Sequence, residues 1–235
     1  MNTTNHSSYL KGEETLLHYL VREPKIKVNK KPPLLLLLHG VGSNEKDLFS
    51  LAETLPPEFL IVSARAPYTL GNESYAWYHV DFSTGKPVIN KEQAEKSRSI
   101  IIQFINQLKE KQDFDEDQVY LSGFSQGGIM AYSVGLTRPD KIKGIAVLSG
   151  RLLEEVKPCI WEGGKLKNLN VFILHGKEDP VLHVEYAKQA VLFLKAKGVK
   201  FVFKEYNAGH TIIPEMQEDL TSWLKTTAAN KVSIN

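Results

Sequence analysis

Residues 118–134 read QVYLSGFSQGGIMAYSV and place one serine between two glycines where two different sequence patterns meet. Residues 118–122 are typical of a short buried strand, and residues 129–134 have the amphipathic pattern of a helix that continues up to Pro139. In so sharp a turn, side chains two positions before and after Ser125 would collide with it, and Gly123 and Gly127 remove them. The stretch predicts that Ser125 is a nucleophile at a strand-to-helix turn. The alternative is a glycine-rich turn with an idle serine.

Apolar segments of strand length recur along the chain, and each is followed by a loop that contains Gly, Pro, Asn or Asp. The first consists of the five consecutive leucines at 34–38, a length and composition that favour a strand covered on both faces. Helical patterns alternate with these segments, most clearly over residues 91–111. The other segments are strands near 59–62, 142–148, 171–174 and 201–203, and helices with apolar faces over 184–194 and 216–224.

This alternation predicts an α/β fold with a mostly parallel central sheet flanked by helices. Residues 15–21 are expected to add an antiparallel hairpin with 25–28 at one edge. No linker, repeat or low-complexity tract is visible, so residues 1–235 are predicted to form a single domain without a large lid.

Composition narrows the function classes. The net charge of +2 is too small to indicate a nucleic-acid surface, and the basic cluster at 22–31 is interpreted as solvating the early hairpin. No apolar run approaches the roughly 20 residues of a membrane span, and the polar residues 1–8 lack the features of a signal peptide. The single cysteine, Cys159, allows no intrachain disulfide and is expected to be a small buried apolar residue. A cytoplasmic protein without integral membrane association is predicted.

A serine nucleophile needs a base, and the base needs an orienting group. Ligands of parallel sheets bind at the carboxyl ends of the strands, so both partners are sought in the loops there. Asp179 follows the strand near 171–174, where Pro180 fixes a turn, and Glu178 is its rival as the acid. His210 lies after the final strand and before the last helix, which gives the chain order Ser, Asp, His.

The remaining histidines are assigned other roles. His39 and His175 each end a strand before a glycine, and both are expected to bond to loop backbones. His79 and His183 are left as candidate pocket residues. His175, Asp179 and His183 recur every four residues, as metal ligands on a helix would, but Pro180 interrupts that helix. No metal and no cofactor are predicted.

Acyl transfer also requires donors for the oxyanion of the tetrahedral intermediate. In the geometry of a hydrolase, one backbone N–H comes from the residue after the nucleophile, Gln126, and the second from the glycine-rich loop at 39–42. A phosphate cradle is the alternative for this loop, but no G-x-x-x-x-G-K-[ST] run accompanies it.

Four motifs in this order resemble the phospholipase/carboxylesterase family of α/β-hydrolases, which includes the acyl-protein thioesterases. They are LHGVG at 38–42, GFSQGG at 123–128, HGKEDP at 175–180 and GH at 209–210, and the resemblance covers about residues 32–225. It implies a catalytic triad of Ser125, Asp179 and His210, with Val41 and Gln126 at the oxyanion hole. It also implies that Trp77 and Tyr78 form an aromatic pair near the acyl site.

Two departures from the thioesterase pattern favour the bacterial carboxylesterase branch. Residues 64–67 read ARAP, where the thioesterases usually have a histidine before Ala-Pro, and residues 43–47 after Gly42 read SNEKD. The expected activity is hydrolysis of small-molecule carboxylic esters with small or medium acyl chains. A lysophospholipase or acyl-protein thioesterase is the alternative, followed by a catalytically silent binding protein on the same scaffold. The resemblance is also compatible with a homodimer.

Aromatic residues are dense in the loop at 67–87, and Leu152, Leu153 and Trp161 follow Gly150. These side chains are interpreted either as the lining of an acyl groove or as an ordinary loop core.

Overall fold

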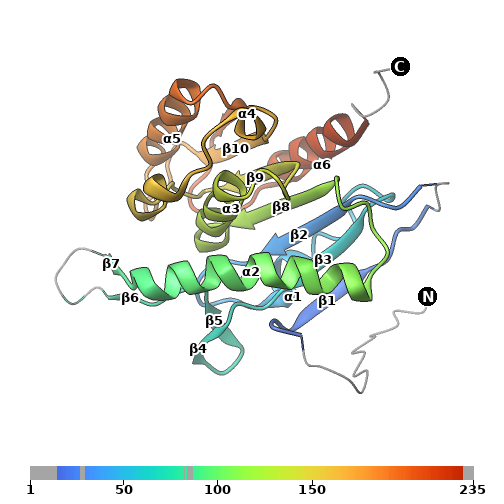
Figure 1. Ribbon diagram of the computed structural model, residues 1–235. Helices are drawn as coiled ribbons and strands as arrows, with labels where there is room; N and C mark the ends of the chain where they lie inside the picture. The colour runs from blue at the N-terminus through green and yellow to red at the C-terminus, as the bar shows by residue number, and fades with distance from the viewer. Residues whose placement is uncertain (1–14, 27–29, 82, 84–86, 230–235) are drawn as a thin grey trace.

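The computed structural model describes residues 15–26, 30–81, 83 and 87–229. Its centre is a seven-stranded sheet in the order β1-β3-β2-β8-β9-β10-β11 (Figure 1). Only β1 is antiparallel to its neighbour, which confirms the predicted mostly parallel sheet. The strands are β1 Tyr19–Arg22, β2 Leu34–Leu38, β3 Leu60–Ala64, β8 Val119–Phe124, β9 Gly144–Leu148, β10 Asn170–Gly176 and β11 Lys200–Tyr206.

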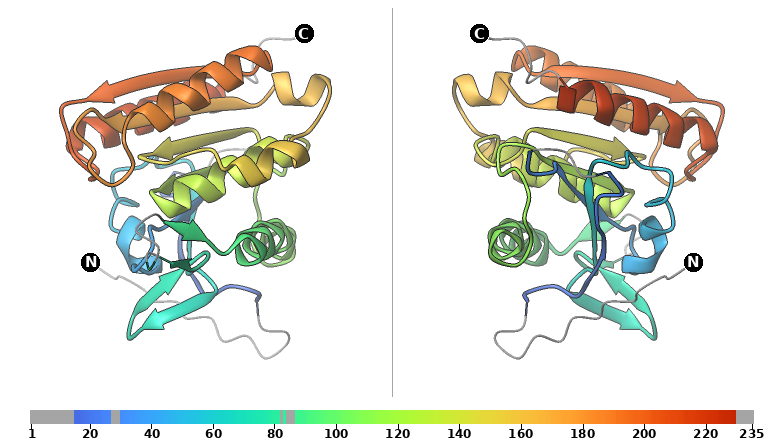
Figure 2. Two further views of the ribbon diagram at one scale, coloured as in Figure 1. Left: turned by 90° about the vertical axis from the view of Figure 1, so that its left-hand side faces the viewer. Right: turned by 90° about the vertical axis from the view of Figure 1, so that its right-hand side faces the viewer.

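Helices cover both faces of this sheet (Figure 2). Apolar residues of α2, α3 and α5 share one buried cluster with the sheet, and those of α1 and α6 share the other. The helices are α1 Glu45–Phe49, α2 Lys91–Lys111, α3 Gln126–Thr137, α4 Gly164–Lys167, α5 Glu185–Ala196 and α6 Pro214–Ala229, with a 3₁₀ helix, η1, at Glu154–Cys159. Within the described ranges, no helix is both long enough and apolar enough to cross a membrane.

The five leucines of β2 form a strand that is buried along its whole length, as predicted. Leu34, Leu36 and Leu38 pack into the cluster under α2, α3 and α5, and Leu35 and Leu37 into the cluster under α1 and α6. A fully buried leucine stabilises the fold by about 1.5–3 kcal/mol relative to an exposed one. An uninterrupted apolar run is therefore favourable only where both faces are covered.

The predicted early hairpin is wrong in its pairing. β1 does lie antiparallel at the edge of the sheet, but its partner is β3, with Tyr19 opposite Ala64 and Arg22 opposite Ile61. Pairing with the sheet lets Tyr19 pack edge-on against Phe104 of α2, with ring centroids 5.3 Å apart. Residues 27 and 28 of the expected second strand lie outside the described residues.

Two burial predictions are also wrong. α3 is buried on every side rather than amphipathic, because it lies between the sheet on one side and α2 and η1 on the other. Cys159, expected to be buried, is exposed at the end of η1. In both cases the packing of neighbouring elements, which local sequence does not encode, determines the burial.

The turn between β8 and α3 depends on two glycines at which a side chain has no room. A Cβ on Gly127 would lie 1.8 Å from the carbonyl oxygen of Leu38, and a Cβ on Gly123 would lie 2.3 Å from the backbone of Gly127. The sequence predicts that these glycines avoid collisions with Ser125 itself. In the structure, they instead avoid clashes with the backbone of neighbouring residues. Ser125 between them has a φ of 53°, a left-handed conformation that is uncommon for residues other than glycine.

We expect Gly127→Ala to destabilise the fold by more than about 3 kcal/mol, because the carbonyl of a central strand cannot move away. Gly71→Ala is the matched control, since a Cβ there would meet nothing within 4 Å, and it should change the free energy of unfolding by less than about 0.5 kcal/mol. Urea denaturation of both variants measures the difference. Equal stabilities would contradict the steric explanation.

Candidate active site

The carboxyl ends of three strands bring together Ser125, Asp179 and His210. Ser125 follows β8, Asp179 follows β10, and His210 follows β11. Nε2 of His210 lies 2.9 Å from Oγ of Ser125, and Nδ1 of His210 lies 2.7 Å from Oδ2 of Asp179. The three side chains thus form one continuous hydrogen-bonded chain, although they are separated by as many as 85 residues in the sequence.

Asp179 is held by more than the histidine. Its Oδ1 accepts hydrogen bonds from the backbone N–H groups of Val181 and Leu182, at 2.9 and 2.8 Å. Burial by itself would raise the pKa of Asp179, but the hydrogen bonds from His210, Leu182 and Val181 outweigh it and hold the pKa below its ordinary value. The carboxylate is therefore ionised at neutral pH, and it accepts a hydrogen bond from Nδ1–H of His210.

The ring of His210 is also positioned by packing. Its centroid lies 4.8 Å from that of Phe124, the residue before Ser125. The ring of His175 is buried. Its Nε2 lies 3.5 Å from Oδ2 of Asp179 and 2.6 Å from the carbonyl oxygen of Leu182. Bonding of His175 to a loop backbone confirms its predicted structural role.

The glycine-rich loop at 39–42 lies against Ser125. A Cβ on Gly40 would lie 3.5 Å from Cβ of Ser125, so the backbone approaches the serine closely. Among the described residues, no acceptor bonds to the N–H of Val41, whose side chain is exposed. Gln126 is the first residue of α3, and the first N–H groups of a helix have no partner within it. Among the described residues, the N–H groups of Val41 and Gln126 are therefore both left without an acceptor.

Trp77 and Tyr78, the expected aromatic pair near the acyl site, lie beside the start of α3 with their side chains packed into the protein. Their exposed fractions are 0% and 1%, so neither offers a surface that a substrate could contact. The side-chain amide of Gln126 instead joins this segment to α3, because Oε1 accepts from the N–H of Trp77 at 2.8 Å and Nε2 donates to the carbonyl of Tyr78 at 2.7 Å. Ser97 of α2 donates to the carbonyl of Trp77.

His39 and Trp77 fix the backbone of the glycine-rich loop. Nε1 of Trp77 donates to the carbonyl of His39, and Nε2 of His39 accepts the N–H of Ala66 at 3.0 Å. Because Nε2 is an acceptor, Nδ1 carries the proton and donates it to the carbonyl of Gly40 at 2.7 Å. Burial lowers the pKa of His39, so the neutral ring is the stable form. The predicted structural role of His39 is confirmed.

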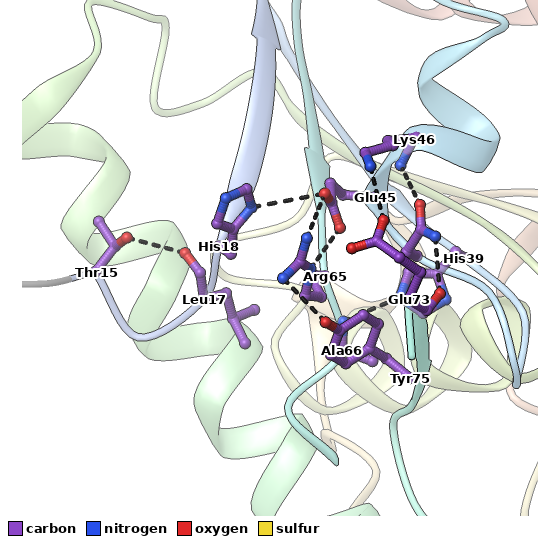
Figure 3. A network of polar contacts seen from close by, with 11 residues as sticks. Thr15, Leu17, His18, His39, Glu45, Lys46, Arg65, Ala66, Glu73 and Tyr75 are labelled. Atoms are coloured by element: carbon purple, nitrogen blue, oxygen red, sulfur yellow. Dashed lines mark hydrogen bonds and ion pairs between the residues drawn. The ribbon is translucent and has the colours of Figure 1, made fainter. Parts of the chain in front are cut away.

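A buried ion pair supports the same loop from the outside (Figure 3). Both nitrogens Nε and Nη2 of Arg65 donate to Glu45, at 2.6 and 2.7 Å, and the Glu45 carboxylate is only 1% exposed. The guanidinium of Arg65 lies 4.5 Å from the ring centroid of Tyr75 and donates to its hydroxyl. The backbone of Tyr75 in turn bonds to Gly42 and Ser43, so the ion pair fixes the far end of the loop.

The other candidates lie away from this cluster. The side chains of His79 and His183 are exposed, and neither takes part in the hydrogen bonds that join Ser125, His210 and Asp179. Glu178 is exposed and bonds through its N–H to Ala208. Leu153 is buried in the cluster under α2, α3 and α5, and Leu152 packs against that cluster. This packing fits a loop core. Among the described residues, no group of His, Cys, Asp and Glu side chains could hold a metal ion.

The described part of the segment at 67–87 does not form an open groove. Two short hairpins begin in it, β4 Tyr68–Gly71 with β5 Ser74–Ala76, and β6 Val80–Asp81 with β7 Val88–Ile89. Phe82 lies outside the described residues. The buried aromatic side chains of Trp77 and Tyr78 and the contacts of Tyr75 favour the loop-core interpretation.

A serine on a strand-to-helix turn, at the carboxyl end of a mostly parallel sheet, is the arrangement of the α/β-hydrolase class. The family model described as Phospholipase/Carboxylesterase matches residues 21–228, and the chain belongs to this family.

The chain is similar both to proteins named acyl-protein thioesterases and to proteins named carboxylesterases. An acyl-protein thioesterase 1 of Mycosarcoma maydis is 29% identical over 90% of this chain and 97% of its own. The carboxylesterase SOBER1 of Arabidopsis thaliana is 28% identical over 81% of this chain and 89% of its own. Among solved structures, esterase PE8 superposes with a TM-score of 0.78 at 25% identity, covering 90% of this chain and 99% of that one.

Sequence reasoning missed the supports of the site. From the sequence, Gln126 has a role only through its backbone N–H, and Glu45 stands out only as part of the SNEKD stretch after Gly42, with no partner assigned. A signal for the ion pair was present, because Arg65 stands where the thioesterase pattern has a histidine. Its partner could not be found from sequence, since Glu45 is 20 residues away and faces it only in the folded protein.

We expect Arg65→Met to destabilise the fold by about 3 kcal/mol or more, because it leaves the Glu45 carboxylate buried without its partner. Arg138→Met is the matched control. Arg138 pairs with Asp140 nearer the surface, where an ion pair is worth about 1 kcal/mol or less. Urea denaturation at neutral pH compares them, and a cost for Arg65→Met no larger than that for Arg138→Met would contradict the assigned role.

A second expectation concerns pH. Burial lowers the pKa of His39 and His175 from the ordinary value of 6.5, so below pH 6.5 the unfolded chain binds protons that the folded chain does not. Stability should therefore be constant above about pH 7 and fall below about pH 6.5, by at most about 1.4 kcal/mol per pH unit for each histidine. The carboxylate of Asp179 does not contribute in this window, because it titrates at lower pH in both states.

The free energy of unfolding from pH 8 to pH 5, measured by urea denaturation, tests this. His39→Gln should lose part of the slope. A wild-type profile that stays flat below pH 6.5 would contradict the neutral assignment of both rings.

Proposed function

We propose that the protein is a serine carboxylesterase in which Ser125 is the nucleophile, His210 the general base and acid, and Asp179 the group that orients the histidine. One observation carries the proposal. Nε2 of His210 lies within hydrogen-bond distance of Oγ of Ser125, and Nδ1 of the same ring lies within hydrogen-bond distance of the Asp179 carboxylate.

The ionised state of Asp179 fixes the direction of proton transfer. Its carboxylate accepts Nδ1–H of His210 and leaves Nε2 free to accept the proton of Ser125. As Oγ attacks the ester carbonyl, the new Oγ–C bond forms and the proton moves to Nε2. When the bond from carbon to the alcohol oxygen breaks, Nε2–H protonates the departing oxygen. A water molecule then repeats the sequence on the acyl-enzyme and releases the acid.

The N–H groups of Val41 and Gln126 are proposed as the oxyanion hole. Gln126 directly follows Ser125, Val41 directly follows Gly40, whose backbone lies against Ser125, and neither N–H is needed for the secondary structure. A single donor of this kind contributes about 3 kcal/mol in the transition state. Trp77, His39 and the side chain of Gln126 hold the two donors in register, because they tie the loop at 39–42 to the start of α3.

Small or medium acyl chains are the proposed substrates, and a location in the cytoplasm is proposed with them. The described part of the segment between β3 and α2 forms two short hairpins instead of a helical lid, and Trp77 and Tyr78 are packed into the protein. This leaves less apolar surface for a long chain than the aromatic sequence suggested.

Thioester cleavage is the second candidate, because relatives with 28–29% identity over most of the chain are named acyl-protein thioesterases. The same nucleophile, base and oxyanion donors serve both reactions. The distinction lies in the relative kcat/KM for an oxygen ester and a thioester with the same acyl group.

We expect Ser125→Ala to reduce esterase kcat/KM by at least about 10⁴-fold, as removal of a triad nucleophile does, with an unchanged Tm. The measurement is a chain-length series of p-nitrophenyl esters, compared with an acyl-thioester and a lysophospholipid. Wild type should be labelled at Ser125 by a fluorophosphonate probe, and the variant should not.

Two results would contradict the proposal. One is an active Ser125→Ala protein, and the other is a folded wild type that neither turns over any ester nor reacts with the probe. A higher kcat/KM for the thioester would select the second candidate instead.

A further inference from the structure

A cavity of about 260 Å³ lies beside His210, on the side of the sheet covered by α1 and α6. Its apolar lining consists of Leu48 of α1, Leu51 of the following turn, Phe124 and Ile212. His210 itself lines the cavity, so the ring that contacts Ser125 is also a part of its wall. The space is slightly below the range of about 300–1,000 Å³ that is usual for drug-sized ligands, and it suits a small group.

The position beside His210 determines which part of an ester would lie there. The carbonyl carbon of the tetrahedral intermediate carries four groups: Oγ of Ser125, the oxyanion, the acyl chain and the alcohol oxygen. The oxyanion points to the N–H groups of Val41 and Gln126. The alcohol oxygen must face Nε2 of His210, because that atom gives it a proton as it leaves. Because His210 lines the cavity, the cavity is placed to take the remainder of the alcohol rather than the acyl chain.

The lining indicates the chemistry of that alcohol. Four apolar side chains form the walls, and Ser50, Thr211 and Gln217 add neutral polar groups. The carboxylate of Asp47 is the only acid, and the described residues that line the cavity include no Lys or Arg. Since no fixed positive charge balances Asp47, an anionic alcohol such as a phosphorylated glycerol would be repelled.

We infer that this cavity is the leaving-group subsite of the enzyme and that it selects esters of small, uncharged alcohols. The inference rests on the proposed esterase function and extends it by naming the half of the substrate that the cavity binds. It also weighs against lysophospholipids, whose leaving group carries a phosphate.

Two acetate esters with different alcohols test the inference, because both form the same acetyl-enzyme and differ only before the alcohol leaves. Leu51→Trp fills the cavity from its partly buried wall. We expect it to lower the ratio of kcat/KM for benzyl acetate to that for methyl acetate at least tenfold. Leu51→Ala enlarges the cavity and should raise the same ratio. Leu192→Trp, on the exposed face of α5 and 68% exposed, is the matched control and should leave the ratio as in wild type.

A second series holds the alcohol fixed and varies the acyl chain, from methyl acetate to methyl hexanoate. The ratios within this series should be the same in Leu51→Trp as in wild type. If they fall instead, the cavity binds the acyl chain. If neither series changes, or if Leu51→Trp and Leu51→Ala shift the alcohol ratio in the same direction, the inference is wrong.

Charge selection is tested with Asp47→Asn, which keeps an oxygen to accept the hydrogen bond that Ser43 gives at 2.7 Å. The ratio of kcat/KM for acetoxyacetate, an ester with an anionic alcohol, to that for ethyl acetate should rise several-fold. An unchanged ratio would contradict the role of Asp47. All of these measurements presuppose an active wild type that is labelled at Ser125, so a failure of the esterase function itself is recognised separately.

Discussion

The close approach of Gly127 to the carbonyl of Leu38 is the constraint on which the rest of the structure depends. A Cβ would lie 1.8 Å from that oxygen, so α3 can begin directly above β2 only with glycine at this position. The approach goes with a sharp bend of the chain, in which Ser125 has a φ of 53° and Gln126 is the first residue of the helix. The geometry of the nucleophile thus follows from a steric contact between backbones.

The contacts around the site extend from this turn in three directions. The Gln126 amide holds the segment at 77–78, and through Trp77 it holds the carbonyl of His39. The pair formed by Glu45 and Arg65 secures the other end of the glycine-rich loop through Tyr75. Phe124 packs on the ring of His210. Each of these groups is buried or half-buried, and each leaves the proposed oxyanion donors and the histidine fewer alternative positions. Such preorganisation is what electrostatic stabilisation of an oxyanion requires.

The charges near the site are arranged so that each buried ionisable group has one stable form. Asp179 remains a carboxylate because three N–H groups donate to it. His39 and His175 remain neutral because burial opposes their charge. Glu45 remains ionised because both nitrogens of a fork-shaped guanidinium bond to it.

The amino-acid sequence by itself determined the alternation of the main strands and helices, the mostly parallel sheet, the bounds of α2 and the strand-turn-helix around Ser125, because periodicity, glycines and prolines act locally. It also identified the residues that form the hydrogen-bonded chain, since strand ends in such a sheet share one edge. The tertiary structure alone decided that β1 pairs with β3, that α3 is buried on all sides, that Trp77 and Tyr78 pack inward, and that Cys159 is exposed. It alone brought Glu45 to Arg65 and formed the cavity beside His210. These features depend on contacts between segments that are distant in sequence, and such contacts have no local signature.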